Sequence, residues 1–225
     1  MNQIPPVTKN LLFLNVIFFL AAMVTPRIGI DLQSIMALHY FEAENFAFYQ
    51  FITYMFMHGG FAHLFFNMFA LWMFGCTLEM VLGAKKFLIY YMVCGLGAGL
   101  IQEVVQFVEL SPIIAHYNQM NMGGILLPMA DYLNLMNTVG ASGAVFGILL
   151  AFGMLFPNQQ MFVFPLPFPI KAKFFVIGYA AIELLFGFQG NDNVAHFAHL
   201  GGMLFGFLLI TYWRKKYRNN GQYTY

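Results

Sequence analysis

The hydrophobic positions of this chain gather into six long runs, and polar residues collect between them. The runs lie near residues 10–26, 61–82, 86–107, 138–157, 172–189 and 194–213. A helix needs about 20 apolar residues to cross a bilayer, so several runs require a thinned bilayer or ends buried in protein. Because the runs are continuously apolar and do not alternate, they predict helices rather than a β-barrel. The pattern indicates an all-α polytopic membrane protein with six spans.

Composition supports this class of protein. Of the 225 residues, 60% are hydrophobic and 8% are charged, whereas soluble domains carry about 25% charged residues. The net charge of +1 does not favour nucleic acid as a partner. Cys76 and Cys94 lie inside apolar runs and predict neither a disulfide framework nor a metal site. We expect one membrane domain over residues 1–225, with a six-helix core at about 10–213 and short tails.

The basic residues predict the orientation of the spans, since Lys and Arg accumulate on the cytoplasmic side. With a cytoplasmic N-terminus, nine of the ten basic residues fall on that side and only Arg27 falls outside. The nine are Lys9, Lys85, Lys86, Lys171, Lys173, Arg214, Lys215, Lys216 and Arg218. We therefore expect both termini to be cytoplasmic. Of the two long outer loops, 27–60 should be interfacial and partly helical, while the sequence says little about 108–137.

The unusual polar residues gather at the outer ends of the second, fourth and sixth runs. They are His58, His63, Asn67, Ser142, His196 and His199. At a helical rise of about 1.5 Å per residue, Ser142 and His199 lie at matching depths, roughly 5–8 Å below the outer boundary. His63 and Asn67 are four residues apart and share one helix face. Polar groups in a membrane domain usually face its interior. Ser142, His199, His63 and Asn67 are therefore expected to line one pocket.

Glycine spacing predicts that the fourth and sixth runs touch. Gly143 with Gly147, and Gly202 with Gly206, each form a G-x-x-x-G pattern that lets helix backbones approach closely. Such contact would bring the serine and the histidine within hydrogen-bond reach. Taken alone, Ser142 also fits a plain packing face, with its hydroxyl bonded to a carbonyl one turn earlier.

A serine beside a neutral imidazole can act as a nucleophile, and the intermediate then needs hydrogen-bond donors for its oxyanion. The candidate donors are His63, the side-chain amide of Asn67 and the backbone N–H of Ser142. No carboxylate is adjacent to His199 in the sequence; the nearest, Asp192, is about two helical turns away. The pattern therefore predicts a Ser142–His199 dyad and not a triad.

These residues resemble the motifs of the rhomboid intramembrane serine proteases. The motifs, in chain order, are His58-x-x-x-x-His63-x-x-x-Asn67, Gly140-x-Ser142-Gly143 and Ala198-His199-x-x-Gly202-x-x-x-Gly206. The resemblance spans residues 10–213 approximately. It implies a six-helix rhomboid-like bundle and a serine endopeptidase that cleaves transmembrane proteins near the outer membrane face. It implies no cofactor and no metal.

The resemblance also implies individual roles. Ser142 would be the nucleophile and His199 the general base. The oxyanion hole would consist of His63, Asn67 and the Ser142 amide. Three residues would support these: Gly140 by allowing close backbone approach, Phe146 by packing on the His199 ring where many members carry Tyr, and His58 as a structural or water-positioning residue.

Two features set this chain apart from many members. The first outer loop has no Trp, so it lacks the Trp-Arg pair found there in many rhomboids. His196 also follows an alanine, but the spacing to Gly202 and Gly206 selects His199 as the base. We interpret His196 as a pocket-rim or structural residue.

The remaining polar residues have plainer interpretations. Glu103 and Glu183 lie toward outer helix ends, where interfacial exposure makes an ionised carboxylate inexpensive. His39 and His116 lie in the outer loops and are expected to be solvated. Loop 189–193, together with the fifth run, is the candidate gate for substrate.

Other functions fit parts of the sequence. A non-catalytic rhomboid-like binder of membrane clients is the main alternative, although such a protein would be expected to lack the nucleophile or the base. A metal transporter could use the clustered histidines, but no intramembrane carboxylate is expected to join them. An aspartyl protease is excluded because Asp31, Asp131 and Asp192 lie outside the central spans. The expected location is the bacterial cytoplasmic (inner) membrane, with the lipid bilayer and transmembrane substrates as partners.

Overall fold

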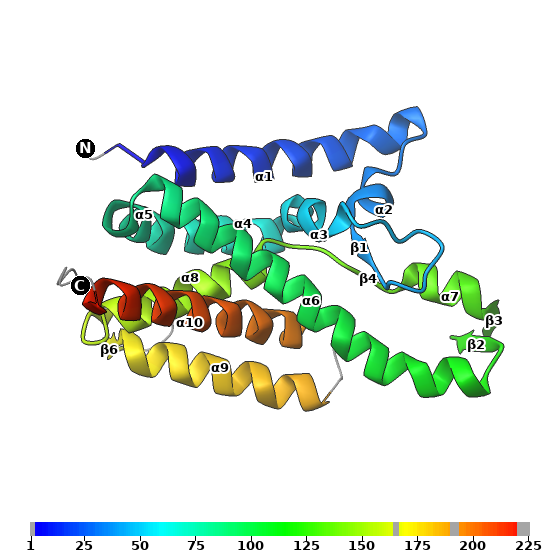
Figure 1. Cartoon of the computed structure of the whole chain (residues 1–225). Coiled ribbons are helices and arrows are strands. Elements are labelled where there is room, and N and C mark those ends of the chain that lie inside the picture. Colours follow the sequence, from blue (N-terminus) through cyan, green and yellow to red (C-terminus); the bar gives the residue numbers. More distant parts are fainter. Residues whose placement is uncertain (1–2, 164–166, 190–193, 220–225) are drawn as a thin grey trace.

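The structure, a computed structural model, describes residues 3–163, 167–189 and 194–219. Its long helical segments lie alongside one another in a bundle (Figure 1). They are α1 (Pro6–Val24), α4 (Phe61–Ala70) continuing through the π-helical turn η3 (Leu71–Gly75) into α5 (Cys76–Leu82), α6 (Ala84–His116), α8 (Ser142–Leu155), α9 (Ala172–Gln189) and α10 (His196–Asn219). The predicted helical character is thus found, with three short two-stranded ladders added to it within the described residues.

Length and apolar composition qualify four segments of the described chain to cross a membrane. They are Pro6–Ile28, Phe61–Leu82, Ala84–His116 and Ala172–Gln189. The segment α8 is also apolar but has only 14 residues. It begins later than the predicted run because Gly140 has a φ of 133°, which is not helical. It ends at Leu155, two residues before Pro157, because the residue preceding a proline disfavours helix.

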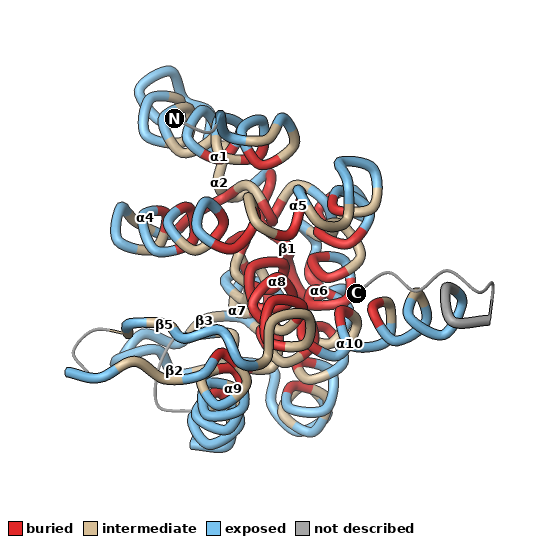
Figure 2. Tube along the Cα trace, turned by 90° about the vertical axis from the view of Figure 1, so that its left-hand side faces the viewer, coloured by how far each residue is buried: buried red, intermediate tan, exposed pale blue. Residues whose placement is uncertain are grey.

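The short helix α8 occupies the centre of the bundle. Most of its residues are buried, and its tube is largely red at the middle of Figure 2. It is packed against α6 and α10, which also pack against each other. By contrast, α1 and α9 lie at the periphery and expose large apolar side chains such as Phe13 and Ile177. This arrangement lets a helix too short for the bilayer be surrounded by protein, while its longer neighbours present apolar surface outward.

Glycines permit the close crossing of α8 and α10. A side chain at Gly202 would overlap the backbone of Gly143, and one at Gly147 would overlap Cys94 of α6. The contact predicted from the two glycine patterns is therefore present. It fixes the second turn of α10, at Gly202, against the first turn of α8, at Gly143.

A buried carboxylate fastens α1 to the bundle. Glu79 of α5 accepts hydrogen bonds from the backbone N–H groups of Val7 (2.9 Å) and Thr8 (2.7 Å) and from the Thr8 hydroxyl (2.8 Å). These backbone donors belong to the first turn of α1, where amides have no partner within the helix and the helix dipole favours negative charge. Glu79 therefore fixes the start of α1 against α5.

The two ends of the bundle differ in character. At one end, here called the termini end, α1 begins, α5 meets α6, α9 begins and α10 ends (Figure 1). The opposite end, here called the loop end, carries the segments 29–60 and 117–141. Of the described basic residues, Arg27 alone is on the loop-end side, in the turn η1 (Thr25–Ile28) that follows α1.

The loop end is folded more extensively than the sequence indicated. Its elements are α2 (Leu32–Met36), β1 (Leu38–His39), α3 (Gln50–Thr53), η2 (Tyr54–Phe56), β2 (Gln119–Met122), β3 (Ile125–Pro128), α7 (Met129–Leu135) and β4 (Asn137–Thr138). β1 pairs antiparallel with β4, and β2 pairs antiparallel with β3. A small separate core of Tyr40, Ala43, Leu110 and Leu133 joins the first loop to α6 and α7. At the termini end a further ladder joins β5 (Gln160–Met161) to β6 (Ile170–Lys171).

Two expectations of solvent exposure at this end are wrong. His39 is only 1% exposed, and its ring nitrogens lie 3.1 Å from the carbonyl oxygen of Asn134 and 2.8 Å from that of Ser34. Glu103 is 5% exposed and accepts a 2.9 Å hydrogen bond from the backbone N–H of Phe41. Both side chains bind backbone groups of the first outer loop, which explains how that loop stays folded over the bundle. His116 is exposed, as expected.

Candidate active site

Ser142 is the first residue of α8, and the chain reaches it through a constrained turn. The Gly140 N–H donates to the Tyr54 carbonyl (2.9 Å), which anchors the turn to η2. A Cβ atom at Gly140 would lie 2.8 Å from the His63 ring, so no other residue fits without displacing that histidine. Positive φ and this close approach together require glycine here. The turn places the Ser142 side chain between α4 and α10.

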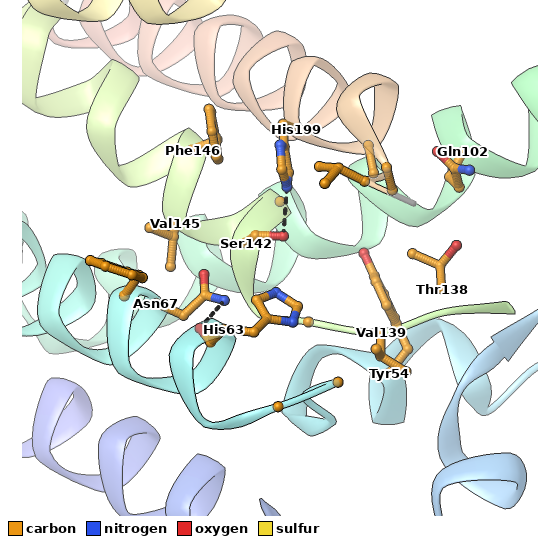
Figure 3. A pocket seen from close by; sticks show the side chains of 18 of the residues that line it. Tyr54, His63, Asn67, Gln102, Thr138, Val139, Ser142, Val145, Phe146 and His199 are labelled. Carbon is orange, nitrogen blue, oxygen red and sulfur yellow. Dashed lines mark hydrogen bonds between the residues drawn. The ribbon is translucent and has the colours of Figure 1, made fainter. Parts of the chain in front are cut away.

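His199 faces Ser142 from the first turn of α10. Its Nε2 lies 2.8 Å from the Ser142 Oγ (Figure 3). Phe146, one turn further along α8, stacks on the imidazole with ring centroids 4.2 Å apart and planes inclined by 6°. The hydroxyl and the imidazole are 57 positions apart in the chain and are held within reach for proton transfer, which requires about 2.6–3.2 Å.

His63 and Asn67 approach the serine from α4. Figure 3 shows the His63 ring beside Ser142, with Asn67 one turn further along the helix. The Asn67 side-chain N–H donates to the His63 carbonyl at 3.0 Å. To bind an oxyanion, this amide has to leave the carbonyl of its own helix. The arrangement brings all four predicted pocket residues to one place.

These four side chains border a cavity of about 1210 Å³. Its walls come from α4, α8, α10, the strand β4 and the turn around Gly140, and Tyr179 of α9 closes one side. The cavity is large enough for several residues of an extended peptide, since drug-sized ligands occupy about 300–1,000 Å³. Ser142 and His199 therefore have room for a peptide-sized ligand beside them.

His58 lies behind His63, outside the cavity lining. It is 3% exposed, and its ring centroid is 5.0 Å from that of His63. Neither ring nitrogen has a hydrogen-bond partner among the described residues. Burial, and to a smaller degree the neighbouring His63, lower the pKa of His58 to about 4. His58 is therefore a neutral ring packed beneath His63.

One carboxylate at this site is not predicted by the sequence. Glu183 of α9 is 5% exposed, contrary to the expected interfacial exposure. Its Oε2 accepts a 2.7 Å hydrogen bond from His199 Nδ1 and another of 2.7 Å from His196 Nδ1. The expectation that no intramembrane carboxylate joins the histidines is wrong. His196 and His199 are three positions apart and so share one face of α10. That shared face was the sequence signal that one partner on a neighbouring helix could bind both.

Comparison with known proteins identifies the family. The Rhomboid domain profile matches residues 45–216. The chain is 30% identical to the rhomboid protease AarA of Providencia stuartii over 162 residues, 69% of this chain and 52% of AarA. It is 33% identical to the rhomboid protease GluP of Bacillus subtilis over 157 residues, 69% of this chain and 24% of GluP. It is 32% identical over 156 residues to the mitochondrial rhomboid protein 1 of Saccharomyces cerevisiae, 68% of this chain and 38% of that protein.

The chain belongs to the rhomboid family. The resemblance drawn from the three motifs is confirmed, and the protein is a polytopic integral membrane protein with several apolar helices. The matched region spans about half or less of each of the three rhomboid relatives described above. All three rhomboid motifs of this chain lie within residues 45–216.

The carboxylate and the two histidines of this rhomboid also have to be considered as a metal site. Their nearest ligand atoms lie within 4.8 Å of one another. A four-coordinate zinc ion with ligands at about 2.0–2.1 Å would hold those atoms more than about 3 Å apart. The observed 2.7 Å separations are instead those of hydrogen bonds between imidazole N–H groups and a carboxylate. The predicted gate loop cannot be placed beside the cluster, since residues 190–193, including Asp192, lie outside the described residues.

Proposed function

We propose that this rhomboid is an intramembrane serine endopeptidase with Ser142 as its nucleophile and His199 as its general base. The observation that carries the proposal is the 2.8 Å contact between Ser142 Oγ and His199 Nε2 at the wall of a large cavity. Membership of the rhomboid family and the similarity to two named rhomboid proteases support it. The whole chain is proposed to act as a single membrane domain.

The chemistry follows from the groups in the cavity. His199 Nε2 takes the hydroxyl proton of Ser142 as Oγ attacks the substrate carbonyl carbon. The carbonyl oxygen becomes an oxyanion, for which the Ser142 N–H, the His63 ring and the Asn67 amide are the donors. His199 then passes the proton to the leaving amine, and the peptide bond breaks to give an acyl-enzyme. Water, deprotonated by His199, hydrolyses that ester and regenerates Ser142.

The proposed topology has six spans and cytoplasmic termini. The described basic residues other than Arg27 gather at the termini end, which is the side that the positive-inside rule assigns to the cytoplasm. The loop end would then face outward, and the cavity would open toward it. We propose the bacterial cytoplasmic membrane as the location, in keeping with the bacterial relatives.

The length of α8 accounts for the depth of the nucleophile. Its 14 residues span about 21 Å, whereas the hydrocarbon core is about 30 Å thick. A helix this short leaves its first residue, Ser142, below the outer surface, with the cavity above it to admit water. A transmembrane substrate would have to unwind there, because the carbonyl groups of a helix are already hydrogen-bonded. Transmembrane proteins cleaved near the outer face are therefore the proposed substrates.

Cleavage of a reporter transmembrane helix in proteoliposomes tests the proposal. The wild-type chain should cut the reporter, and Ser142→Ala and His199→Ala should not. Ser111→Ala is the matched control, because Ser111 lies on α6 outside the cavity lining and its hydroxyl donates to the Phe107 carbonyl; it should cut normally. A wild-type chain that binds the reporter without cutting it would instead support the non-catalytic binder.

A further inference from the structure

We propose that Glu183 is a positioning residue for the proposed protease, which converts the Ser142–His199 pair into a hydrogen-bonded triad, with His196 holding the carboxylate in place. This inference rests on the proposed function for its catalytic consequence. The hydrogen-bond arrangement itself does not depend on that function. It is inferred from geometry alone, since one carboxylate oxygen of Glu183 lies 2.7 Å from the Nδ1 atoms of both histidines.

The carboxylate determines which nitrogen of His199 carries the proton. An ionised carboxylate accepts hydrogen bonds and has none to donate. The Nδ1 of His199 must therefore be the N–H donor to Glu183, which leaves Nε2 unprotonated in the neutral ring. That is the nitrogen facing the Ser142 hydroxyl. The tautomer that a general base requires is thus selected by Glu183.

Glu183 lies on the buried face of α9, where a solvated glutamate would not be expected. Most of α9 is exposed, and its buried residues are Ala172, Val176 and Glu183. Glu183 lies seven residues after Val176, about two turns further along the same face, and this face turns toward α8 and α10. Burying a carboxylate is costly unless it is hydrogen-bonded. The two imidazole N–H groups provide those bonds.

His196 gives the carboxylate a second anchor. Its ring is 6.3 Å from that of His199 and nearly perpendicular to it, and it stacks on Phe186 of α9 with centroids 5.8 Å apart. Phe146 packs on His199 in a similar way. Each imidazole is therefore fixed by an aromatic ring and by the same oxygen, so neither Glu183 nor His199 can rotate away without breaking a contact.

Glu183 also affects the charge that forms during the reaction. When His199 takes the serine proton it becomes an imidazolium, and a carboxylate 2.7 Å away stabilises it. Within the described part of the chain, the other titratable groups near His199 are His63 from α4, Tyr179 from α9 and His196 from its own helix. None of these is anionic at neutral pH. Among the described residues, Glu183 is therefore the group that favours proton transfer from Ser142.

The first test is the pH dependence of kcat/KM for reporter cleavage by Glu183→Gln. A glutamine can present its NH₂ to Nδ1 and so favour the wrong tautomer, and it carries no charge. We expect kcat/KM to fall by about 10²- to 10⁴-fold. The acid limb of the pH–rate profile should also move to lower pH, because an imidazolium without its carboxylate loses its proton more readily. His196→Gln should lower the rate by about tenfold, or 1.4 kcal/mol.

The matched control is Glu103→Gln, which neutralises another buried glutamate away from the cavity. Its side-chain oxygen can still accept the Phe41 N–H, so the pH–rate profile should be unchanged. A Glu183→Gln enzyme that retains the wild-type rate would overturn the proposal. A Glu183→Gln enzyme that loses rate with no movement of the acid limb would also overturn it, because that is the result of a merely structural role.

A second measurement needs no variant that could fail to fold. Nitrogen NMR of the wild-type chain with labelled histidine reports the tautomer of each ring. We expect His199 and His196 to carry their protons on Nδ1 at neutral pH, and an Nε2–H tautomer for His199 would contradict the inference. This result does not depend on activity, so a chain that shows the Nδ1–H tautomer but cleaves nothing would refute the proposed function and leave the hydrogen-bond arrangement standing.

Discussion

Glu79 and Glu183 are two buried glutamates in different parts of the bundle, and they show how the donors around a carboxylate decide what it can do. Glu79 and Glu183 are 3% and 5% exposed, and each connects neighbouring helices. Glu79 accepts from two backbone amides and a hydroxyl, which keep their protons at any ordinary pH. Glu183 accepts from two imidazoles, one of which contacts Ser142. The first carboxylate is suited to fixing a helix, and the second to directing a proton.

Replacing Glu183 by leucine should have the largest effect, and that effect should be on activity and not on stability. Activity per folded molecule should fall by about 10²- to 10⁴-fold, because His199 loses the group that selects its tautomer. Stability should change little, since each neutral imidazole can move its proton to the other nitrogen. Reporter cleavage and thermal unfolding in the same detergent measure the two quantities. Loss of stability with normal activity per folded molecule would show that Glu183, like Glu79, only holds helices together.

Replacing Glu79 by leucine should have the opposite outcome. The free energy of unfolding should fall by about 3 kcal/mol, because the first-turn amides of α1 lose their charged acceptor in a buried place. Activity per folded molecule should stay within a factor of about two, since Glu79 lies far from the cavity. Denaturant titration and reporter cleavage check this. Activity that falls well beyond the folded fraction would show that the two sites are coupled.

The buried His58 predicts a pH effect on stability of intermediate size. Its pKa in the folded protein is about 4, against an ordinary value of 6.5. The unfolded chain therefore binds the proton first as pH falls, and His58 contributes stability that is present above pH 6.5 and lost toward pH 4. The loss between about pH 7 and about pH 5 should be about 2 kcal/mol. Unfolding measurements on His58→Phe should show a flatter dependence on pH, and an unchanged slope would contradict this.

A chelator should have the smallest effect. If the Glu183 cluster is held by hydrogen bonds, as its 2.7 Å separations indicate, then EDTA should leave reporter cleavage within a factor of about two. The measurement is the cleavage rate before and after extensive dialysis against EDTA. A loss restored by added zinc would show that the three side chains act as metal ligands.

Much of the site could be predicted from single segments of the sequence. The position of a residue along its helix gives its depth in the membrane, and the spacing of glycines indicates where helices touch. Ser142, His199, His63 and Asn67 each lie near one end of an apolar run, and the glycines of α8 and α10 indicate which faces meet. Helix ends were predicted less well. The turn at Gly140 delays the start of α8, and α6 continues to His116, beyond the predicted end at residue 107, because it also supports the loop end.

Glu183 could not be placed from the sequence for a physical reason. Its depth along α9 is readable, but its direction depends on how α9 packs against α8 and α10, which is a tertiary fact. A glutamate near a helix end is equally compatible with an interfacial position. His39 and Glu103 were misjudged for the same reason, since their partners are backbone groups of segments far away in the chain. Polar residues that pair between segments are the ones that local patterns do not resolve.

Covalent labelling of the purified protein with a fluorophosphonate, followed by mass spectrometry of its peptides, addresses the proposed nucleophile with the fewest assumptions. The phosphonyl group should be found on Ser142, and labelling should disappear in Ser142→Ala and in His199→Ala while Ser111→Ala is labelled normally. Absence of any adduct on Ser142 in a folded wild-type chain, or labelling that persists without His199, would contradict the proposed serine chemistry.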